Sequence, residues 1–239
     1  MHTVTEEIWD NLQALHPPSP ALGEPNDELP EASLINKEAV LASLHSFPRD
    51  TAPGASLLSP QHIKDAVTCK SPILATRALN VLTSTVNLLA SGEATRDIAP
   101  FMAGGGLTPL RKPDDGVRPI AVGESLRRLV GKCLVRHEDA SSHIEGTFLP
   151  NQVGVGISGG AEAVAQSVSC LVEENGEDPD LALLKIDFEN AFNSVSRADL
   201  LDAVQTEFPT LARWAWWCYK EHSKLWIDGK SIKSQSGTQ

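Results

Sequence analysis

The chain has 239 residues, of which 41% are hydrophobic, and this is enough for one large domain or two small ones around an apolar core. Its 31 acidic and 20 basic residues give a formal net charge of −11, which argues against a histone-like, tail-driven nucleic-acid binder. It has no apolar run of about 18 residues, no visible secretory leader and no CxxC pair among its four cysteines. We therefore expect an intracellular protein, in the nucleus or cytoplasm, that spans no membrane and holds no structural zinc.

The amino-terminal part of the chain divides into an acidic segment and a helical segment. Residues 1–36 hold seven acids, five prolines and no Lys or Arg, so we expect a flexible acidic arm with a short helix over Glu6–Leu15. Residues 37–104 show apolar residues at helical spacing and predict a helical extension. The predicted helix starts are Asn36, Ser59-Pro60 and Ser71-Pro72.

Residues 105–180 change character. Segments 107–112 and 117–122 are short and extended, and the residues between them, Pro113 to Gly116, have the composition of a turn. Helices are predicted to follow over residues 124–134 and 161–174.

Residues 181–239 begin with the apolar run Leu181–Ile186, which predicts a buried strand that ends at Asp187. Helices are predicted over Arg197–Gln205 and from Pro209, and the tryptophans of the second helix are expected in the core. An Asp-Gly pair at 228–229 predicts a closing hairpin. This order of helices, hairpins and one strand indicates an α+β fold rather than alternating βαβ units.

Asp187 is the first candidate for chemistry. A carboxylate at the end of a strand can coordinate Mg²⁺, which prefers oxygen ligands and usually needs only one or two carboxylates together with phosphate oxygens. The alternative is that Asp187 only accepts backbone N–H bonds at a turn.

The second candidate is a basic stretch between residues 111 and 136, where seven cations face three acids. A hairpin that carries Lys112 and Arg118 can grip a polyphosphate or a nucleic-acid backbone, although a solvated charged face gives the same pattern. The two candidates reinforce each other, because nucleotidyl transfer needs a metal together with a phosphate clamp. The seven cations are Arg111, Lys112, Arg118, Arg127, Arg128, Lys132 and Arg136.

Four segments together resemble a known family. Leu107–Ile120 and Ser125–Leu129 look like the fingers motifs of reverse transcriptases from non-LTR retrotransposons, and Gln152–Val155 is similar to the short motif that follows them. Lys185–Ser194 resembles the first palm motif, which is an Asp, three open positions, Ala, and then Phe or Tyr. The resemblance implies a right-hand polymerase in which the helical extension precedes fingers at residues 105–180 and a partial palm at 181–239.

The resemblance also implies roles for individual residues. Asp187 would be the first catalytic carboxylate and would ligate Mg²⁺ together with the backbone carbonyl of Phe188. Lys112 and Arg118 would clamp the outer phosphates of an incoming deoxynucleoside triphosphate. Asn190 and Ala191 would present backbone N–H groups to the same nucleotide. Phe192 would be the steric gate that excludes a ribose 2′-OH. The implied partners are a template of RNA or DNA and a primer.

One departure from the family pattern is informative. The family has a second carboxylate pair that follows an aromatic residue, whereas here Tyr219 is followed by Lys220 and the only adjacent aspartates are Asp114-Asp115 in the fingers turn. One carboxylate cannot hold two metal ions about 4 Å apart, so we expect the amino-terminal part of a polymerase that is inactive alone. Two alternatives stay open: a non-catalytic nucleic-acid-binding remnant, and a helical protein-interaction domain that uses the acidic arm.

Overall fold

The computed structural model describes residues 4–25, 28–113, 116–155 and 157–238. The described residues contain eleven α-helices and one four-stranded sheet, which confirms the predicted α+β class. The chain divides into two compact units, Met1–Ala140 with Asn190–Gln239 (unit 1) and Ser141–Glu189 (unit 2). This division differs from the predicted series of arm, extension, fingers and partial palm, because the first and last segments of the chain pack together in unit 1.

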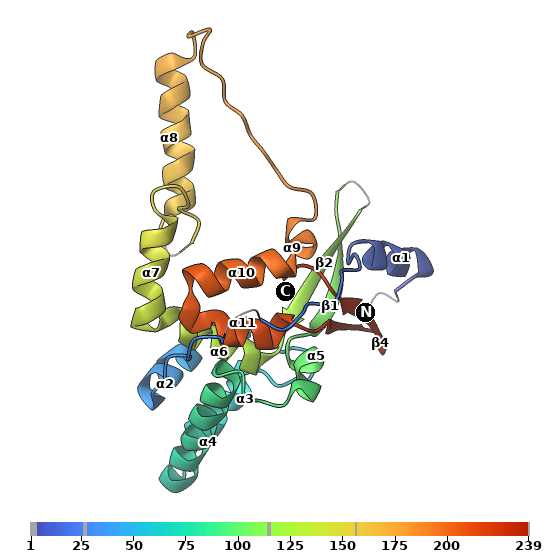
Figure 1. Ribbon diagram of the computed structural model, residues 1–239, viewed down its shortest axis with the longest axis vertical. Helices are drawn as coiled ribbons and strands as arrows, with labels where there is room; N and C mark the ends of the chain where they lie inside the picture. Colours follow the sequence, from blue (N-terminus) through green and yellow to red (C-terminus); the bar gives the residue numbers. More distant parts are fainter. Residues whose placement is uncertain (1–3, 26–27, 114–115, 156, 239) are drawn as a thin grey trace. The chain divides into compact units, whose positions relative to one another are not determined.

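The sheet of unit 1 joins the two predicted hairpins. The first hairpin is β1 (Gly105–Arg111) with β2 (Val117–Gly123), and the second is β3 (Ser223–Ile227) with β4 (Lys230–Ser234). The strand order is β2-β1-β3-β4, and β1 pairs with β3 in parallel through two residues on each strand (Figure 1). Asp228 and Gly229 both have positive φ values, as the predicted two-residue turn requires.

The sheet has an inner face and an outer face, because successive side chains of a strand point to opposite sides. Leu107, Leu225 and Ile232 lie on the inner face and are buried. Helix α1 (Glu6–Ala14) covers this face, and its Leu12 is 0% exposed. Thr5 caps α1 by accepting a hydrogen bond from the backbone N–H of Ile8. The amino-terminal helix is therefore part of the sheet's own core.

The larger core of unit 1 is helical. Asn36 caps α2 and Ser59 caps α3 through their side chains, as the sequence predicted, and His62 completes a capping box with Ser59. Trp214 and Trp217 are buried in this core, which confirms their predicted structural role. The helices that enclose it are α2 (Lys37–His45), α3 (Pro60–Val67), α4 (Pro72–Ala90), α5 (Ala99–Met102), α6 (Ser125–Arg136) and α11 (Ala212–Tyr219), with 3-10 turns at Arg96–Ile98 and Pro209–Leu211.

Helix α4 passes a simple test for a membrane span. Within the described ranges it is the one helix that is long and apolar enough, by length and composition alone, to cross a bilayer. Its Leu82, Val86 and Leu89 pack into the helical core of unit 1. Because helices of soluble cores pass the same test, α4 is weak support for a membrane protein.

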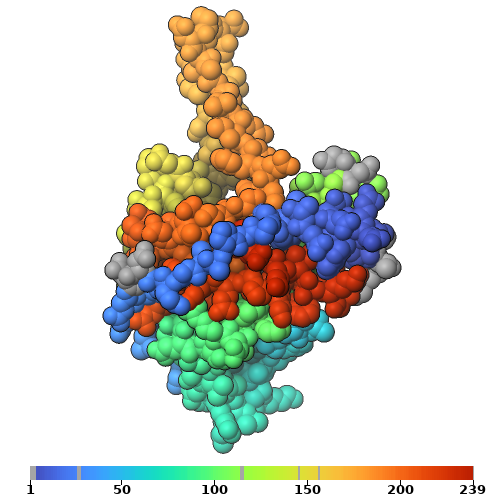
Figure 2. All heavy atoms as spheres, turned by 45° about the vertical axis from the view of Figure 1, so that its right-hand side comes forward, coloured from blue at the N-terminus to red at the C-terminus, as the bar shows by residue number. Residues whose placement is uncertain are grey.

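The acidic arm lies against unit 1 rather than apart from it. Figure 2 shows the blue amino-terminal segment lying across the red carboxyl-terminal segments. Arg213 donates hydrogen bonds from Nε to the carbonyls of Leu29 and Pro30, and Lys220 pairs with Glu24. Ile35 is buried and exchanges two hydrogen bonds with the Asn87 side chain of α4. The acidic arm therefore does not stand apart from unit 1, because its carbonyls and a few of its apolar side chains contact distant segments.

Unit 2 contains most of α7 (Glu138–Phe148), then α8 (Gly160–Asn175) and the segment up to Glu189. The predicted helix over 161–174 is confirmed by α8. The predicted buried strand that ends at Asp187 is wrong, because residues 181–188 form no strand and Leu184 is 80% exposed. No strand among the described residues pairs with this segment, so its apolar side chains have nothing to pack against.

Candidate nucleic-acid interface

Lys112 and Arg118 lie on the outer face of the β1–β2 hairpin. Arg118 pairs with Leu110 across the ladder, and both belong to the set of alternating residues that points away from buried Leu107. The backbone N–H of Lys112 donates to the carbonyl of Gly116 at 2.8 Å, which continues the ladder by one residue and keeps Lys112 in the same alternation. The structure thus brings the two predicted phosphate-binding cations to one face.

Most other cations of the basic stretch have structural partners instead. Arg127 is buried, where it donates to the carbonyl of Ala103 at 3.0 Å and to the hydroxyl of Tyr219 at 2.6 Å. Arg128 and Lys132 both lie over the ring of Phe47. Burial lowers the pKa of Lys132, and the neighbouring Arg136 and Arg128 lower it further. The basic stretch of the sequence therefore does not form one surface, because these helical cations pack against the core of unit 1.

The outer face continues across β3 and β4. Lys224 and Lys233 pair directly across this hairpin, and Trp226 lies two residues beyond Lys224 on the same side. The strand positions on this face include no Asp or Glu. We define the outer face by its cationic and larger apolar residues, which are Leu110, Lys112, Arg118, Ile120, Lys224, Trp226 and Lys233.

The sequence prediction assigned no role to the residues of β3 and β4. The signal was present in the alternation of Ser223, Leu225 and Ile227, which are buried, with Lys224 and Trp226, which are not. What the sequence did not indicate is that β3 pairs with β1 in parallel. That pairing, at Gly105 and Gly106, places both hairpins in one sheet.

The loop that contains Asn190, Ala191 and Phe192 lies in unit 1, where other segments hold it. Asn190 has a φ of 52°, in the left-handed region, and donates from Nδ2 to the carbonyl of Leu15 at 2.9 Å. Helix α9 (Ala191–Ser194) follows, and the Phe192 ring is 79% exposed. The loop therefore presents an aromatic ring to solvent from a backbone fixed by the amino-terminal arm.

The last residues of the chain fix the same loop from the other side. The backbone N–H groups of Gly237 and Thr238 donate to the carbonyls of Val195 and Phe192, at 2.8 and 2.7 Å. Gly237 has a φ of 70°, and a Cβ at this position would lie 2.3 Å from the carbonyl oxygen of Phe192. Glycine is therefore required at residue 237.

Arg197, in α10 (Arg197–Glu207), anchors this closing segment from within. It is 2% exposed and donates to the carbonyls of Gly237 and Glu221 and to the Ser234 hydroxyl, each at 3.0 Å. Its guanidinium also lies over the Tyr219 ring. Burial lowers the pKa of Arg197 to about 10, because these partners are neutral and burial disfavours the charged form.

Asp187 and Phe188 belong to unit 2, whereas the outer face belongs to unit 1. Both side chains are exposed, so the Asp187 carboxylate is open to a ligand. The Asp187 carboxylate and the Phe188 carbonyl are oxygen donors of the kind that Mg²⁺ prefers, but one carboxylate is too few for two ions. Among the described residues, no group of three His, Cys, Asp or Glu side chains forms a metal cluster.

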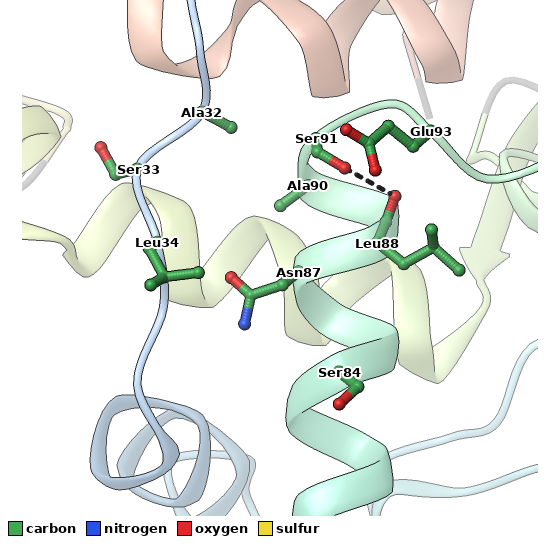
Figure 3. Close-up of a pocket in the computed structure, with 9 residues that line it drawn as sticks. All are labelled: Ala32, Ser33, Leu34, Ser84, Asn87, Leu88, Ala90, Ser91 and Glu93. Atoms are coloured by element: carbon green, nitrogen blue, oxygen red, sulfur yellow. Dashed lines mark hydrogen bonds between the residues drawn. The ribbon is translucent and has the colours of Figure 1, made fainter.

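Figure 3 shows a groove between the arm and α4, with a volume of about 360 Å³. Its lining includes Leu34, Asn87, Leu88 and Glu93 and no cationic side chain. A groove without cations does not suit a polyphosphate. None of its lining residues belongs to the outer face.

No protein-family model matches the chain, and no curated protein matches it.

Proposed function

We propose that the chain forms the fingers and the first part of the palm of an RNA-directed DNA polymerase. The observation that carries the proposal is that Lys112 and Arg118 lie on one face of a hairpin without an acidic strand residue. Two such cations suit the phosphates of a nucleoside triphosphate, because the Arg118 guanidinium can donate two parallel hydrogen bonds and the Lys112 ammonium acts as a point charge.

In the proposed reaction the primer 3′-oxygen attacks the α-phosphorus of a deoxynucleoside triphosphate. A new P–O bond to the primer forms, the proton of the 3′-hydroxyl passes to solvent water, the bond to the β-phosphate breaks, and pyrophosphate leaves. Asp187 and the Phe188 carbonyl would hold Mg²⁺, which supplies charge neutralisation at the reacting phosphate. Lys112 and Arg118 bind the outer phosphates, while the exposed Phe192 ring occupies the space of a ribose 2′-OH.

The exposed segment at 181–188 supports the same proposal. It has the composition of a buried strand, and its apolar side chains face solvent. A polymerase palm would cover such a segment with further strands and would supply the second carboxylate pair. We accordingly expect activity only from a protein in which residues 1–239 are joined to a palm segment that carries an Asp-Asp pair, called the extended protein below.

Replacing both Lys112 and Arg118 by alanine in the extended protein tests the phosphate clamp. We expect the KM for deoxynucleotides to rise roughly 100-fold or more, because two charge-assisted contacts of about 1.5 kcal/mol or more each are lost. Steady-state primer extension measures this. The matched control is Arg111→Ala, since Arg111 precedes Lys112 but belongs to the inner face. An unchanged KM in the double variant, or an equal rise in the control, contradicts the clamp.

Replacing Phe192 by valine tests the steric gate. We expect the preference for deoxynucleotides over ribonucleotides to fall roughly 10- to 100-fold, since the smaller side chain leaves room for a 2′-OH. Competition between the two nucleotide types in primer extension measures the ratio. If sugar selectivity stays at the wild-type level while extension continues, Phe192 is not the gate.

A second candidate function, nucleic-acid binding without catalysis, is favoured by the lack of acids at the strand positions of the outer face. A binding role needs neither a second carboxylate pair nor a metal ion. Salt-sensitive binding of nucleic acid by residues 1–239, with no nucleotide incorporation in the extended protein, would select this function.

A further inference from the structure

Two lysines face each other on the second hairpin. Lys224 and Lys233 are a directly opposed pair in the antiparallel β3–β4 ladder, on the outer face. Like charges in this arrangement repel, and such pairs destabilise a hairpin. Within the described ranges, neither ammonium forms an ion pair with a carboxylate. The fold therefore holds two like charges opposite each other, and no carboxylate of the described residues pairs with either of them.

Two aromatic rings lie beside these lysines. Phe101 of α5 and Trp226 of β3 stack with ring centroids 6.2 Å apart and an angle of 19° between the planes. The Lys224 ammonium lies 4.3 Å from the centroid of Phe101 and 5.9 Å from that of Trp226. Phe101 is 48% exposed and Trp226 is half-buried, so both keep contact with solvent. The cluster combines a cation with rings that a planar group can reach.

A glycine keeps space open next to the tryptophan. Gly106 is paired with Trp226 across β1 and β3, and it has no side chain to cover the ring. A Cβ built on Gly106 would meet only one atom within 4 Å, the backbone nitrogen of Ala55 at 3.9 Å. The ring of Trp226 is therefore flanked on the outer face by a position without a side chain.

We propose that Lys224, Lys233, Phe101 and Trp226 form a binding site for single-stranded nucleic acid. The two ammonium groups bind successive backbone phosphates, and the rings accept an unpaired base by stacking. The site shares the outer face with Lys112 and Arg118, and in this sense it rests on the proposed function. It requires neither Asp187 nor a metal ion, so it can be tested alone.

The chemistry of the cluster selects this ligand among polyanions. A base within a duplex is already stacked on both sides, whereas an unpaired base is free to contact Phe101 and Trp226. The strand positions of the outer face hold no Asp or Glu, and the acids of α1 belong to the helix that covers the inner face. Local charge, more than total charge, determines where a polyanion binds.

The site can be tested by measuring how a labelled single-stranded oligonucleotide binds to residues 1–239. Fluorescence anisotropy in the presence of EDTA gives the Kd. We expect Lys233→Glu to raise Kd roughly tenfold or more and to reduce the salt dependence of binding. Lys230→Glu is the matched control, since Lys230 is on the same strand but on the inner face, over Trp9. Equal losses in the two variants would overturn the proposal.

The stacking component has its own test. Trp226→Leu is expected to weaken binding of the oligonucleotide roughly 5- to 100-fold, as loss of one stacked base implies, and to leave binding of inorganic polyphosphate unchanged. Phe101→Leu removes the second ring from a different element, and it decides the question if Trp226→Leu does not fold. Equal losses for both ligands, no loss in either variant, or competition by duplex as strong as by single strand contradicts the site.

The outcome is separable from the polymerase proposal. Asp187→Asn is expected to leave oligonucleotide Kd within twofold of the wild type, since Asp187 has no part in this site. Both proposals are supported if Lys233→Glu loses oligonucleotide binding and if Asp187→Asn loses primer extension in the extended protein. No binding by the wild-type chain overturns the strand site alone and leaves the role of Asp187 to the extension assay.

Discussion

Asp187→Asn is expected to reduce primer extension by the extended protein roughly a thousandfold or more. The amide keeps the size of the side chain but removes the charge that would hold Mg²⁺. Loss of several kcal/mol of transition-state stabilisation lowers the rate tenfold for each 1.4 kcal/mol or so. Single-turnover extension of a labelled primer at saturating nucleotide measures the chemical step directly.

The control for this variant is Glu189→Gln, two residues away. Glu189 is also an exposed carboxylate, and it stands at a position that the palm pattern leaves open. We expect it to extend primers at close to the wild-type rate. Extension by Asp187→Asn at a rate similar to that of Glu189→Gln would remove Asp187 from the proposed metal site.

Arg197→Ala is expected to lower the free energy of unfolding of the chain by about 3 kcal/mol or more. The substitution leaves the carbonyls of Gly237 and Glu221 and the Ser234 hydroxyl without their buried donor, and each such loss costs about 1 to 3 kcal/mol. It also opens a cavity beside Tyr219. Urea unfolding followed by circular dichroism gives the difference.

Two further variants separate hydrogen bonding from packing at Arg197. Arg197→Met keeps much of the side-chain volume and removes every donor, so we expect a loss smaller than that of the alanine variant but still above 1 kcal/mol or so. Arg118→Ala, at an exposed arginine of the outer face, is expected to change stability by less than about 0.5 kcal/mol. Equal stability of wild type and Arg197→Ala would show that Arg197 does not hold the closing segment.

Local signals in the sequence predicted much of unit 1. The composition of residues 113–116 predicted a turn for the first hairpin, and residues 114 and 115 of that turn lie outside the described residues. The Asp228-Gly229 pair permits few backbone shapes, so the second hairpin could be predicted. Side-chain caps at Asn36 and Ser59 fixed helix starts for the same reason. These features depend on residues within a few positions of each other.

Features that depend on distant partners could not be predicted. The apolar run at 181–186 satisfies every local rule for a strand, yet no described strand pairs with it. The arm has the composition of a flexible segment, yet Arg213, Asn87 and the sheet's inner face provide partners for its carbonyls and for Leu12. The sequence shows Arg127 only as one cation of the basic stretch, whereas the fold buries it beside Tyr219.

The candidate site shows the same division between local features, which could be predicted, and features that depend on distant partners, which could not. Lys112 and Arg118 share a face because they belong to one hairpin, and the sequence gives that spacing directly. Lys224, Trp226 and Lys233 joined them only through the parallel contact of β1 with β3, which spans more than a hundred residues of sequence.

The most direct test of the polymerase account is the distance between the outer face and the segment that carries Asp187. Spin labels at Leu110→Cys and Glu189→Cys, with the accessible Cys69 and Cys170 replaced by serine, report this distance by pulsed electron resonance. In the extended protein with template, primer and deoxynucleotide, we expect one short, narrow distance distribution. A broad, long distribution that the ligands do not change would contradict it.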